Sequence, residues 1–375
     1  MERPRRVAWV YRTPDTSTFR YRAANMVAAL NADPECDIGA AWFSESELDA
    51  LERVIDRLDA IVLVRYPFCA PLARLVDRAE QAGVPMVFDT DDLVFDPALA
   101  PLIMDALDQD LENYDQWSYW YAYLGQLRAT MERCVGAITT VDPLRHQLEK
   151  QLGQSRVGVV PNFLDRRQQD YSRALMDAKR ASGFRRDKSV TIGYFSGTRT
   201  HAKDFAVIAP VLHRLLRDDS SVRLRVVGRL DVLGDLAGLP VDQIEVVGFM
   251  DYVPLQRAIA DVEVNLAPLQ QHAFTACKSE LKYFEAAAVG SWTVASPSPA
   301  FAGSIANGKT GRLAKAHEWD EALREAVELA RDADSFAQRA EEAAADVHDR
   351  YAWDAQSNVI SGALDVALQS GEASR

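Results

Sequence analysis

Short apolar runs alternate with longer stretches of helical periodicity through the first 165 residues. Five of these runs have the length and character of strands, and they span residues 7–11, 38–43, 60–64, 85–88 and 135–141. Helical patterns lie between several of them, at residues 21–30, 72–82 and 116–134. Strands that alternate with helices indicate parallel βαβ units, so this part of the chain is expected to form a doubly wound sheet.

A second series of the same kind begins after residue 188. Its predicted strands span residues 190–195, 222–227, 244–247, 262–266 and 293–295, and its helices span 205–217, 254–260 and 279–289. Helical patterns at 319–332, 334–350 and 353–368 follow the last of these strands. At 375 residues the chain is long enough for two such domains, each with its own core. The expected fold class is therefore α/β, with two Rossmann-like, doubly wound parallel-sheet domains.

The two series are separated by a polar stretch without strand character. It is rich in Arg, Gln, Asp and Lys, and we interpret residues 166–188 as a linker. Residues 1–165 then form the first domain and residues 189–352 form the second.

Composition places the chain among globular proteins, because 48% of its residues are apolar and 26% are charged. No apolar run approaches the roughly 20 residues that a membrane span needs. The first six residues lead directly into a predicted strand without the apolar region of a signal peptide. The four cysteines lack metal-ligand or CxxC spacing, so we expect them to be reduced and the protein to be cytoplasmic.

The net charge of −13 makes a nucleic-acid partner unlikely on electrostatic grounds. It also argues against strong docking to anionic membranes, which attract basic patches. Membrane association is therefore not indicated.

The loop at residues 195–204 reads F-S-G-T-R-T-H-A-K-D and lies between a predicted strand and a predicted helix. Doubly wound domains bind ligands in such loops, outside the carboxyl ends of the strands. Gly197 permits close backbone approach, and the side chains that could donate to phosphate oxygens are Thr198, Arg199, His201 and Lys203. The loop does not match the P-loop pattern. Taken alone, a solvated turn is the simpler explanation.

A second candidate begins at Lys278, where the chain reads K-S-E-L-K-Y-F-E-A-A-A-V-G-S-W-T-V-A-S. A helix is expected from Ser279 to Gly290, with Glu285 beside three alanines. Lys278 and Glu285 are seven residues apart and would lie on nearly the same helix face. An anion at the helix start and a carboxylate two turns later would suit a nucleoside diphosphate and its ribose. An ordinary amphipathic helix with exposed charges is the alternative.

The run E-A-A-A-V-G at 285–290, followed by T-V-A-S at 293–296, resembles the donor-site helix and strand of GT-B retaining glycosyltransferases, family 4 in particular. Residues 159–163 resemble the segment that closes the first domain in this family. The resemblance implies two domains that face a central cleft, the first on the acceptor side and the second holding a nucleotide-sugar donor. It also implies that the helix within residues 353–375 crosses back to the first domain.

The resemblance implies a role for individual residues. In family 4 the Glu at the place of Glu285 binds the donor ribose, and a second Glu eight positions earlier binds the sugar. Cys277 occupies that earlier place here, so Lys278 and Glu280 are the candidates for reading the sugar. Arg199 and Lys203 would neutralise the diphosphate. Further donor contacts are expected from Gly197, Thr198, His201, Gly228, Ser279 and Leu281.

The motif Asp89-Thr90-Asp91-Asp92 follows a predicted strand of the first domain. Carboxylates so close together repel one another, so a partner must offset the cost. Three interpretations remain open: helix capping with solvent exposure, a DxD metal site, and hydrogen bonding to acceptor hydroxyls. Similar sequences occur in the family 4 subgroup that the K-S-E-L-K run also resembles. This resemblance favours the third interpretation and assigns Asp89 and Asp92 to the acceptor. No metal is expected to be required.

Six aromatic residues lie within ten positions of the first domain, at Tyr114, Trp117, Tyr119, Trp120, Tyr121 and Tyr123. Aromatic rings stack on sugar faces, so these residues could form a wall on the acceptor side. Trp and Tyr at a domain interface explain the cluster equally well.

These observations predict a retaining glycosyltransferase, of the hexosyltransferase type, that moves a sugar from a nucleoside diphosphate sugar to a hydroxyl acceptor. The acceptor would be a glycan or a small molecule. Two alternatives stay open: a GT-B sugar-nucleotide epimerase, and a catalytically inactive sugar-nucleotide-binding partner of another transferase.

Overall fold

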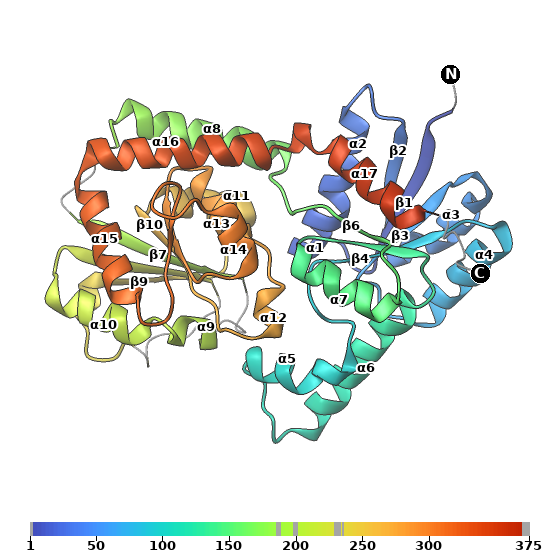
Figure 1. Cartoon of the computed structure of the whole chain (residues 1–375), viewed down its shortest axis with the longest axis horizontal. Helices are drawn as coiled ribbons and strands as arrows, with labels where there is room; N and C mark the ends of the chain where they lie inside the picture. The colour runs from blue at the N-terminus through green and yellow to red at the C-terminus, as the bar shows by residue number, and fades with distance from the viewer. Residues whose placement is uncertain (1–2, 185–188, 198–201, 229–233, 235, 370–375) are drawn as a thin grey trace. The chain divides into compact units, whose positions relative to one another are not determined.

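The computed structural model describes residues 3–184, 189–197, 202–228, 234 and 236–369. Contacts between residues divide the chain into two compact units. Figure 1 labels the helices and strands of both. Unit 1 comprises Met1–Ile103, Asp110–Phe163 and Trp353–Arg375, and unit 2 comprises Met104–Gln109 and Leu164–Ala352. Among the described residues no helix is long and apolar enough to cross a membrane.

Unit 1 is built on a parallel sheet of six strands in the order β2-β1-β3-β4-β5-β6. The strands are β1 (Arg5–Tyr11), β2 (Ile38–Phe43), β3 (Ala60–Val64), β4 (Met86–Thr90), β5 (Gly136–Thr139) and β6 (Val157–Val159). All residues of β3, β4 and β5 are buried, as expected for central strands of a parallel sheet that helices cover on both faces.

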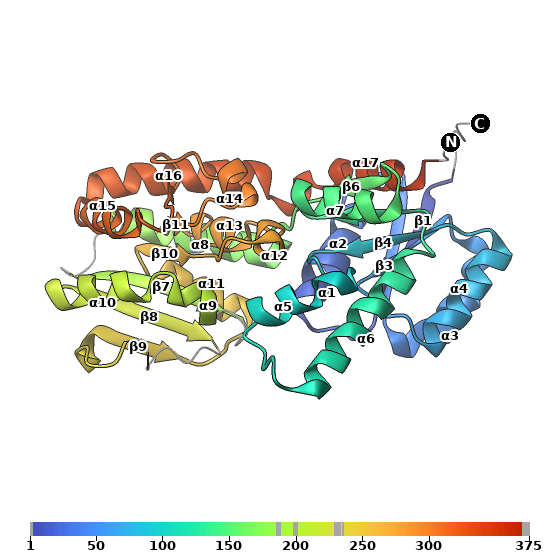
Figure 2. The same ribbon diagram turned by 60° about the horizontal axis from the view of Figure 1, so that its bottom comes forward.

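The helices of unit 1 follow the strands in regular alternation. They are α1 (Ser17–Phe19), α2 (Asn25–Ala32), α3 (Leu48–Glu52), α4 (Ala70–Ala82), α5 (Ala100–Ala106), α6 (Tyr114–Met131), α7 (Asp142–Leu152) and α17 (Ser357–Leu368), of which α5 runs across the division between the units. Helix α17 contacts α2, β5 and β6 (Figures 1 and 2). A side chain at Gly158 would collide with the Ala363 backbone, so glycine is needed where β6 meets this helix.

Unit 2 contains a second parallel sheet, in the order β12-β11-β10-β7-β8-β9. Its strands are β7 (Val190–Ser196), β8 (Val222–Gly228), β9 (Ile244–Val247), β10 (Val264–Ala267), β11 (Trp292–Ala295) and β12 (Arg312–Leu313). Its helices are α8 (Arg166–Ala181), α9 (Ala202–Ala206), α10 (Ala209–Asp218), α11 (Tyr252–Ala260), α12 (Ala273–Ala276), α13 (Leu281–Ala287), α14 (Pro299–Ser304), α15 (Trp319–Arg331) and α16 (Ala333–Arg350).

The structure differs from the sequence prediction at the stretch interpreted as a linker. Residues 166–181 form α8, which belongs to unit 2 and runs beside α16 in Figure 1. Asp165 caps its first turn, and Arg180 pairs with Glu341 of α16. The helix buries Leu175 and Met176, but its neighbouring buried positions are polar. That polar composition conceals the helical pattern.

Two short edge strands, β6 and β12, were not among the predicted strands. With three and two residues, they carry too little periodicity to be recognised. Helix α13 is shorter than expected, because it begins at Leu281. Gly290 adopts φ +66° after its end, and the backbone N–H of Ser291 bonds to the Ala286 carbonyl, which closes the helix.

Candidate functional site

The carboxyl ends of β7 and β10 meet where the order of connections in the second sheet reverses. From β7 the chain proceeds to β8 on one side, whereas β10 and β11 lie on the other. Open α/β sheets bind ligands at such a switch point. Side chains hold the surrounding loops together: Asp204 of α9 accepts from the backbone N–H of Gln270 at 3.0 Å, and Ser296 Oγ accepts from the N–H of Leu269 at 2.9 Å.

A lysine that none of the sequence patterns indicated lies at this switch point. Lys282, in the first turn of α13, places its Nζ 4.5 Å from the centre of the Tyr194 ring on β7. The amine is shielded from solvent and has no hydrogen-bond partner among the described residues. Burial lowers the pKa of Lys282 from 10.5 to about 8, and the nearby carboxylates of Asp204 and Glu285 only partly oppose this effect.

A buried amine without a partner is costly, because charged groups in protein interiors are normally paired. Two features make the cost tolerable here. The Tyr194 ring offers a cation–π contact. The amine also sits beside loops at the ligand-binding edge, where an anion could pair with it. The Lys282 amine therefore lies at the switch point without a hydrogen bond to any described residue.

Glu285 is buried one helical turn beyond Lys282. Its Oε1 accepts from Nε2 of Gln168 at 3.2 Å, and its backbone carbonyl accepts from Nε2 of Gln256 at 2.7 Å. Gln168 of α8 thus contacts the carboxylate, whereas Gln256 of α11 contacts the backbone of the same residue. Residues three apart on a helix are neighbours, which places Lys282 and Glu285 close together. The ribose-binding role of Glu285 stays a prediction.

The two candidates for reading the sugar lie in the turn before α13. Lys278 precedes the helix and therefore does not share a helix face with Glu285; its Nζ lies 4.4 Å from the centre of the Phe274 ring. Glu280 is 6% exposed, and its Oε1 accepts from the Tyr351 hydroxyl at 2.8 Å. Burial raises the pKa of Glu280, and its other oxygen has no partner in the described part of the chain.

The remaining residues of this turn are partly or fully covered. Ser279 lies in the extended segment before α13, Leu281 opens the helix and is half-buried, and Cys277 is buried with a reduced thiol. The structure thus brings Lys278, Ser279, Glu280 and Leu281 next to Lys282, and their contacts with a donor stay predictions.

The predicted diphosphate loop is only partly described. Thr198, Arg199 and His201 lie outside the described residues. Gly197 follows β7 and is exposed, with open space where a side chain would begin. Lys203, in α9, pairs its Nζ with Asp105 Oδ1 at 2.7 Å, and both side chains are partly exposed. A phosphate at this position would have to replace Asp105 as the partner of Lys203.

Gly228 has a structural role at the end of β8. It adopts φ +124°, and a Cβ at this position would lie 1.7 Å from the backbone oxygen of Ser196 on β7. Only glycine allows the two strand ends to approach this closely. A contact with the base, which the resemblance implies, stays a prediction.

A hollow of about 290 Å³ opens beside this edge. It is lined by the loops that follow β10 and β11, including Leu269, His272, Thr275 and Ser296. Burial lowers the pKa of His272, so the imidazole is neutral near pH 7. Its Nδ1 accepts from the backbone N–H of Thr275 and caps α12.

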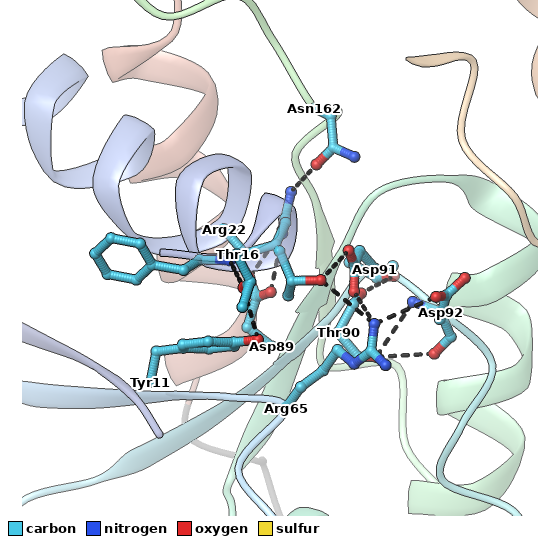
Figure 3. Close-up of polar contacts among 12 residues, drawn as sticks. Tyr11, Thr16, Arg22, Arg65, Asp89, Thr90, Asp91, Asp92 and Asn162 are labelled. Carbon is cyan, nitrogen blue, oxygen red and sulfur yellow. Dashed lines mark hydrogen bonds and ion pairs between the residues drawn. The ribbon is translucent and has the colours of Figure 1, made fainter. Parts of the chain in front are cut away.

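The acidic motif of unit 1 divides into two separate arrangements (Figure 3). Asp89, on β4, is 1% exposed and accepts from Arg22 through both oxygens, at 2.9 and 2.8 Å. Arg22 also donates to the Val160 carbonyl at 2.7 Å. Both oxygens of Asp89 are thus occupied. Its pair with Arg22 connects three segments of unit 1, which contain Arg22, Asp89 and Val160. A catalytic role for Asp89 stays a prediction, and this pairing speaks against it.

Asp91 and Asp92 instead point toward Arg65, which follows β3 (Figure 3). Nη1 of Arg65 lies 2.9 Å from Asp91 and 3.2 Å from Asp92. The hydroxyl of Thr18, in α1, donates to Asp91 at 3.1 Å. These side chains come from the carboxyl ends of β1, β3 and β4 and keep partial exposure. Of the two predicted acceptor carboxylates, Asp92 is thus the one at a ligand-accessible edge.

The described residues contain no group of three or more His, Cys, Asp or Glu side chains placed to hold a metal ion. In the motif itself, arginines occupy the positions that a cation would take beside the carboxylates. The motif is therefore built as a set of ion pairs.

Residues 189–332 match the family model of glycosyl transferases group 1. No curated protein sequence shows significant similarity to the chain. Among solved structures, HepE of Anabaena in complex with UDP and glucose has a TM-score of 0.64 at 13% identity, with coverage of 96% of this chain and 99% of HepE.

Two further solved structures, both of glycosyltransferases, have a similar fold. WaaG, a glycosyltransferase involved in lipopolysaccharide biosynthesis, has a TM-score of 0.62 at 15% identity, covering 97% of this chain and 100% of WaaG. A glycosyltransferase from Rickettsia africae has a TM-score of 0.61 at 12% identity, covering 98% and 100% of the two chains. The protein has the two-domain GT-B fold, which confirms the predicted fold class. Residues 189–332 thus resemble glycosyl transferases group 1, and the chain shares the GT-B fold of these glycosyltransferases.

Proposed function

We propose that the protein is a retaining glycosyltransferase of the family 4 type, which transfers a hexosyl group from a nucleoside diphosphate sugar to a hydroxyl acceptor without a metal ion. The observation that carries the proposal is the shielded amine of Lys282 at the switch point of the sheet, which has no hydrogen-bond partner in the part of the chain that the structure describes. This sheet lies in the segment that matches glycosyl transferases group 1.

The protein's contribution to such a reaction is to position the two substrates and to stabilise the charge on the leaving diphosphate. Lys282 provides a positive charge inside the protein, where electrostatic interactions are stronger than in water. Lys203 exchanges Asp105 for a phosphate oxygen, and Arg199 adds a third positive charge. Because these charges pair with the leaving group more strongly than with the bound donor, they lower the barrier.

Glu285 anchors the ribose in this proposal. Its Oε1 is oriented by Gln168, which keeps the carboxylate in place before the donor arrives. Lys278 or Glu280 then contacts the sugar. Glu280 favours a hydroxyl ligand, because one of its oxygens is buried without a partner among the described residues.

The proposal is tested by a thermal-shift screen against UDP, GDP, ADP and dTDP sugars, since bound ligands raise the melting temperature. UDP-glucose is the first donor to examine, because HepE binds it. The sugar is followed by mass spectrometry with and without acceptors. Transfer to an acceptor in the presence of EDTA, with retention of the anomeric configuration, is the expected result.

Other outcomes separate the alternatives. An altered sugar formed from the donor alone would identify an epimerase. Binding without any turnover over a broad acceptor panel would identify an inactive binding partner. Loss of turnover in EDTA would contradict the metal-independent mechanism.

A further inference from the structure

The first half of α6 presents aromatic rings to solvent. No residue from 114 to 123 is buried, although the second half of the same helix buries Leu124, Leu127 and Met131 in the core. The exposed fractions of Tyr114, Tyr119 and Tyr121 are 80%, 61% and 46%. Exposed aromatic residues at this density need a partner other than the core of unit 1.

The rings form an ordered array rather than a loose cluster. Tyr119 and Tyr123 lie parallel, with centroids 6.0 Å apart, and Trp120 meets both of them edge to face. Trp117 stacks on Tyr121, and its Nε1 donates to the Leu111 carbonyl at 2.8 Å. A fixed array binds without a large loss of side-chain entropy. We call these five rings, from Trp117 to Tyr123, the aromatic ladder.

The aromatic ladder is continuous with the polar group at the carboxyl edge of the first sheet. The Tyr123 hydroxyl accepts from Arg65 Nη2 at 3.2 Å, and the same guanidinium pairs with Asp91 and Asp92. Rings for stacking and carboxylates for accepting hydrogen bonds therefore adjoin one another. Sugars offer the matching surface, with apolar C–H faces and hydroxyl donors at their rims.

The charge of this region restricts the ligand further. The segment of unit 1 that carries the ladder, residues 110–127, contains Asp110, Glu112 and Asp115 and no Lys, Arg or His. Phosphate, sulfate, uronic acid and anionic lipid would be repelled by such a surface. Arg65, which follows β3 at this edge, is already paired with two carboxylates. An uncharged ligand with hydroxyl groups meets no such repulsion.

We propose that the aromatic ladder of α6, with Asp91 and Asp92 at its end, binds a carbohydrate without acidic groups, which serves as the acceptor. The statement that this carbohydrate is the acceptor rests on the proposed function, whereas glycan binding itself can be measured separately. The carbohydrate stacks on the ladder rings and donates hydrogen bonds from its hydroxyls to the partly exposed carboxylates of Asp91 and Asp92.

The test begins with a glycan array that carries uncharged α- and β-glucans, mannans and chito-oligosaccharides beside sulfated and uronic-acid-containing glycans. The full-length protein should bind to the immobilised uncharged glycans and not to the acidic ones. The dissociation constant for the best uncharged oligosaccharide is then measured by calorimetry. Trp120→Ala and Tyr119→Ala should each weaken it by tenfold or more.

Trp42→Ala is the matched control, because Trp42 is also an exposed aromatic of unit 1 but lies on the edge strand β2. It should leave glycan affinity within twofold of wild type. All three variants should bind UDP as wild type does, which shows that they are folded. Failure to bind any of the UDP, GDP, ADP and dTDP sugars would overturn the proposed function but not the glycan site.

The inference is overturned if the protein binds no glycan on the array, or if it binds acidic glycans as well as uncharged ones. It is also overturned if Trp42→Ala weakens glycan binding as much as Trp120→Ala does. Binding to vesicles of anionic lipid that depends on Trp120 would overturn it too, because the ladder would then be a membrane contact.

Discussion

The two sheets have the same architecture but treat charge at their carboxyl edges in opposite ways. In unit 1 the positive groups are matched: Arg22 pairs with Asp89, and Arg65 pairs with Asp91 and Asp92. In unit 2 the Lys282 amine is shielded from water without a hydrogen-bond partner among the described residues. The cations of the first edge are hydrogen-bonded to carboxylates, whereas the Lys282 amine at the second edge has carboxylates nearby but no hydrogen bond to any described residue.

The difference bears on the kind of ligand that each edge could bind. An edge with an unpaired cation favours an anion such as a diphosphate, because the ligand supplies the missing counter-charge. An edge with paired charges and surplus carboxylates favours an uncharged partner rich in hydroxyls. The location of a ligand site follows from the fold, but its specificity follows from how far each charge is already satisfied.

The largest expected effect concerns the buried pair of unit 1. Replacing Arg22 with Met leaves the Asp89 carboxylate buried without its partner, and such changes cost about 3–5 kcal/mol. Hydrogen exchange of the β4 and β5 amides reports the stability of unit 1 by itself. The double variant R22M/D89L should recover more than half of the loss, because no charge remains to be buried.

Arg5→Met is the control for this experiment. Arg5 pairs with Asp365 at the surface of the same unit, where side chains are about one-third and one-half exposed. Surface pairs contribute at most about 1 kcal/mol. A loss below 1 kcal/mol for Arg22→Met would show that the pair is not essential to the stability of unit 1.

The next prediction addresses the unpaired charge of unit 2. Lys282→Met keeps the length of the side chain and removes the charge, so the unfolding free energy should stay level or rise. The affinity for UDP should fall by about 10- to 100-fold, as expected for a lost hydrogen bond to a charged group worth about 1.5–3 kcal/mol. Calorimetry measures the affinity, with exposed Lys315→Met as the control. Unchanged affinity would mean that the charge serves the fold alone.

A smaller effect should appear as proton uptake. The free protein holds Lys282 with a pKa of about 8, so the amine is mostly neutral at pH 9. A bound diphosphate favours the charged form and raises this pKa, so UDP binding at pH 9 should take up nearly one proton. Affinity should therefore decline as pH rises above about 8.

Titrations in buffers of different ionisation enthalpy count the protons. The same titration of Lys282→Met should show none of this uptake. Equal uptake in the variant and the wild type would place the titrating group elsewhere.

The smallest effect is expected at Asp105, the partner of Lys203. Asp105→Asn removes a competitor for the lysine, so UDP should bind more tightly. Partly exposed pairs contribute about 0.2–1 kcal/mol, which corresponds to an affinity gain below about sixfold. Weaker binding in this variant would show that Asp105 orients Lys203 rather than competing with the ligand.

The fold was largely predictable, because central strands such as β3 and β11 are continuous apolar or β-branched runs with clear ends. The residues of α8 were predicted as a linker, since their buried face uses Gln168, Gln169 and Ser172. The amide N–H of Gln168 finds its partners elsewhere in unit 2, at Gln256 and Glu285, whereas Ser172 donates to a carbonyl of α8 itself. No local pattern shows that such partners exist.

The site was predictable only in its location. The carboxylate motif of unit 1 was recognised, but its arginines come from distant positions, 67 residues before Asp89 in the case of Arg22. Lys282 escaped notice because a lysine in a helix is usually solvated. Its position three residues before Glu285 was the available signal, since that spacing places both on one side of the helix. Whether a charge is paired depends on three-dimensional neighbours.

The packing of α17 on β5 and β6 also sets an order of events during synthesis. Residues 164–352 leave the ribosome before residues 357–368, so unit 2, apart from the short segment Met104–Gln109, can fold on its own once they emerge. Unit 1 must wait, because one face of β5 and β6 stays exposed to solvent until α17 arrives. A nascent chain stalled near residue 352 would carry a folded second unit and an aggregation-prone first unit. A chaperone that covers apolar strands would protect the first unit from aggregation.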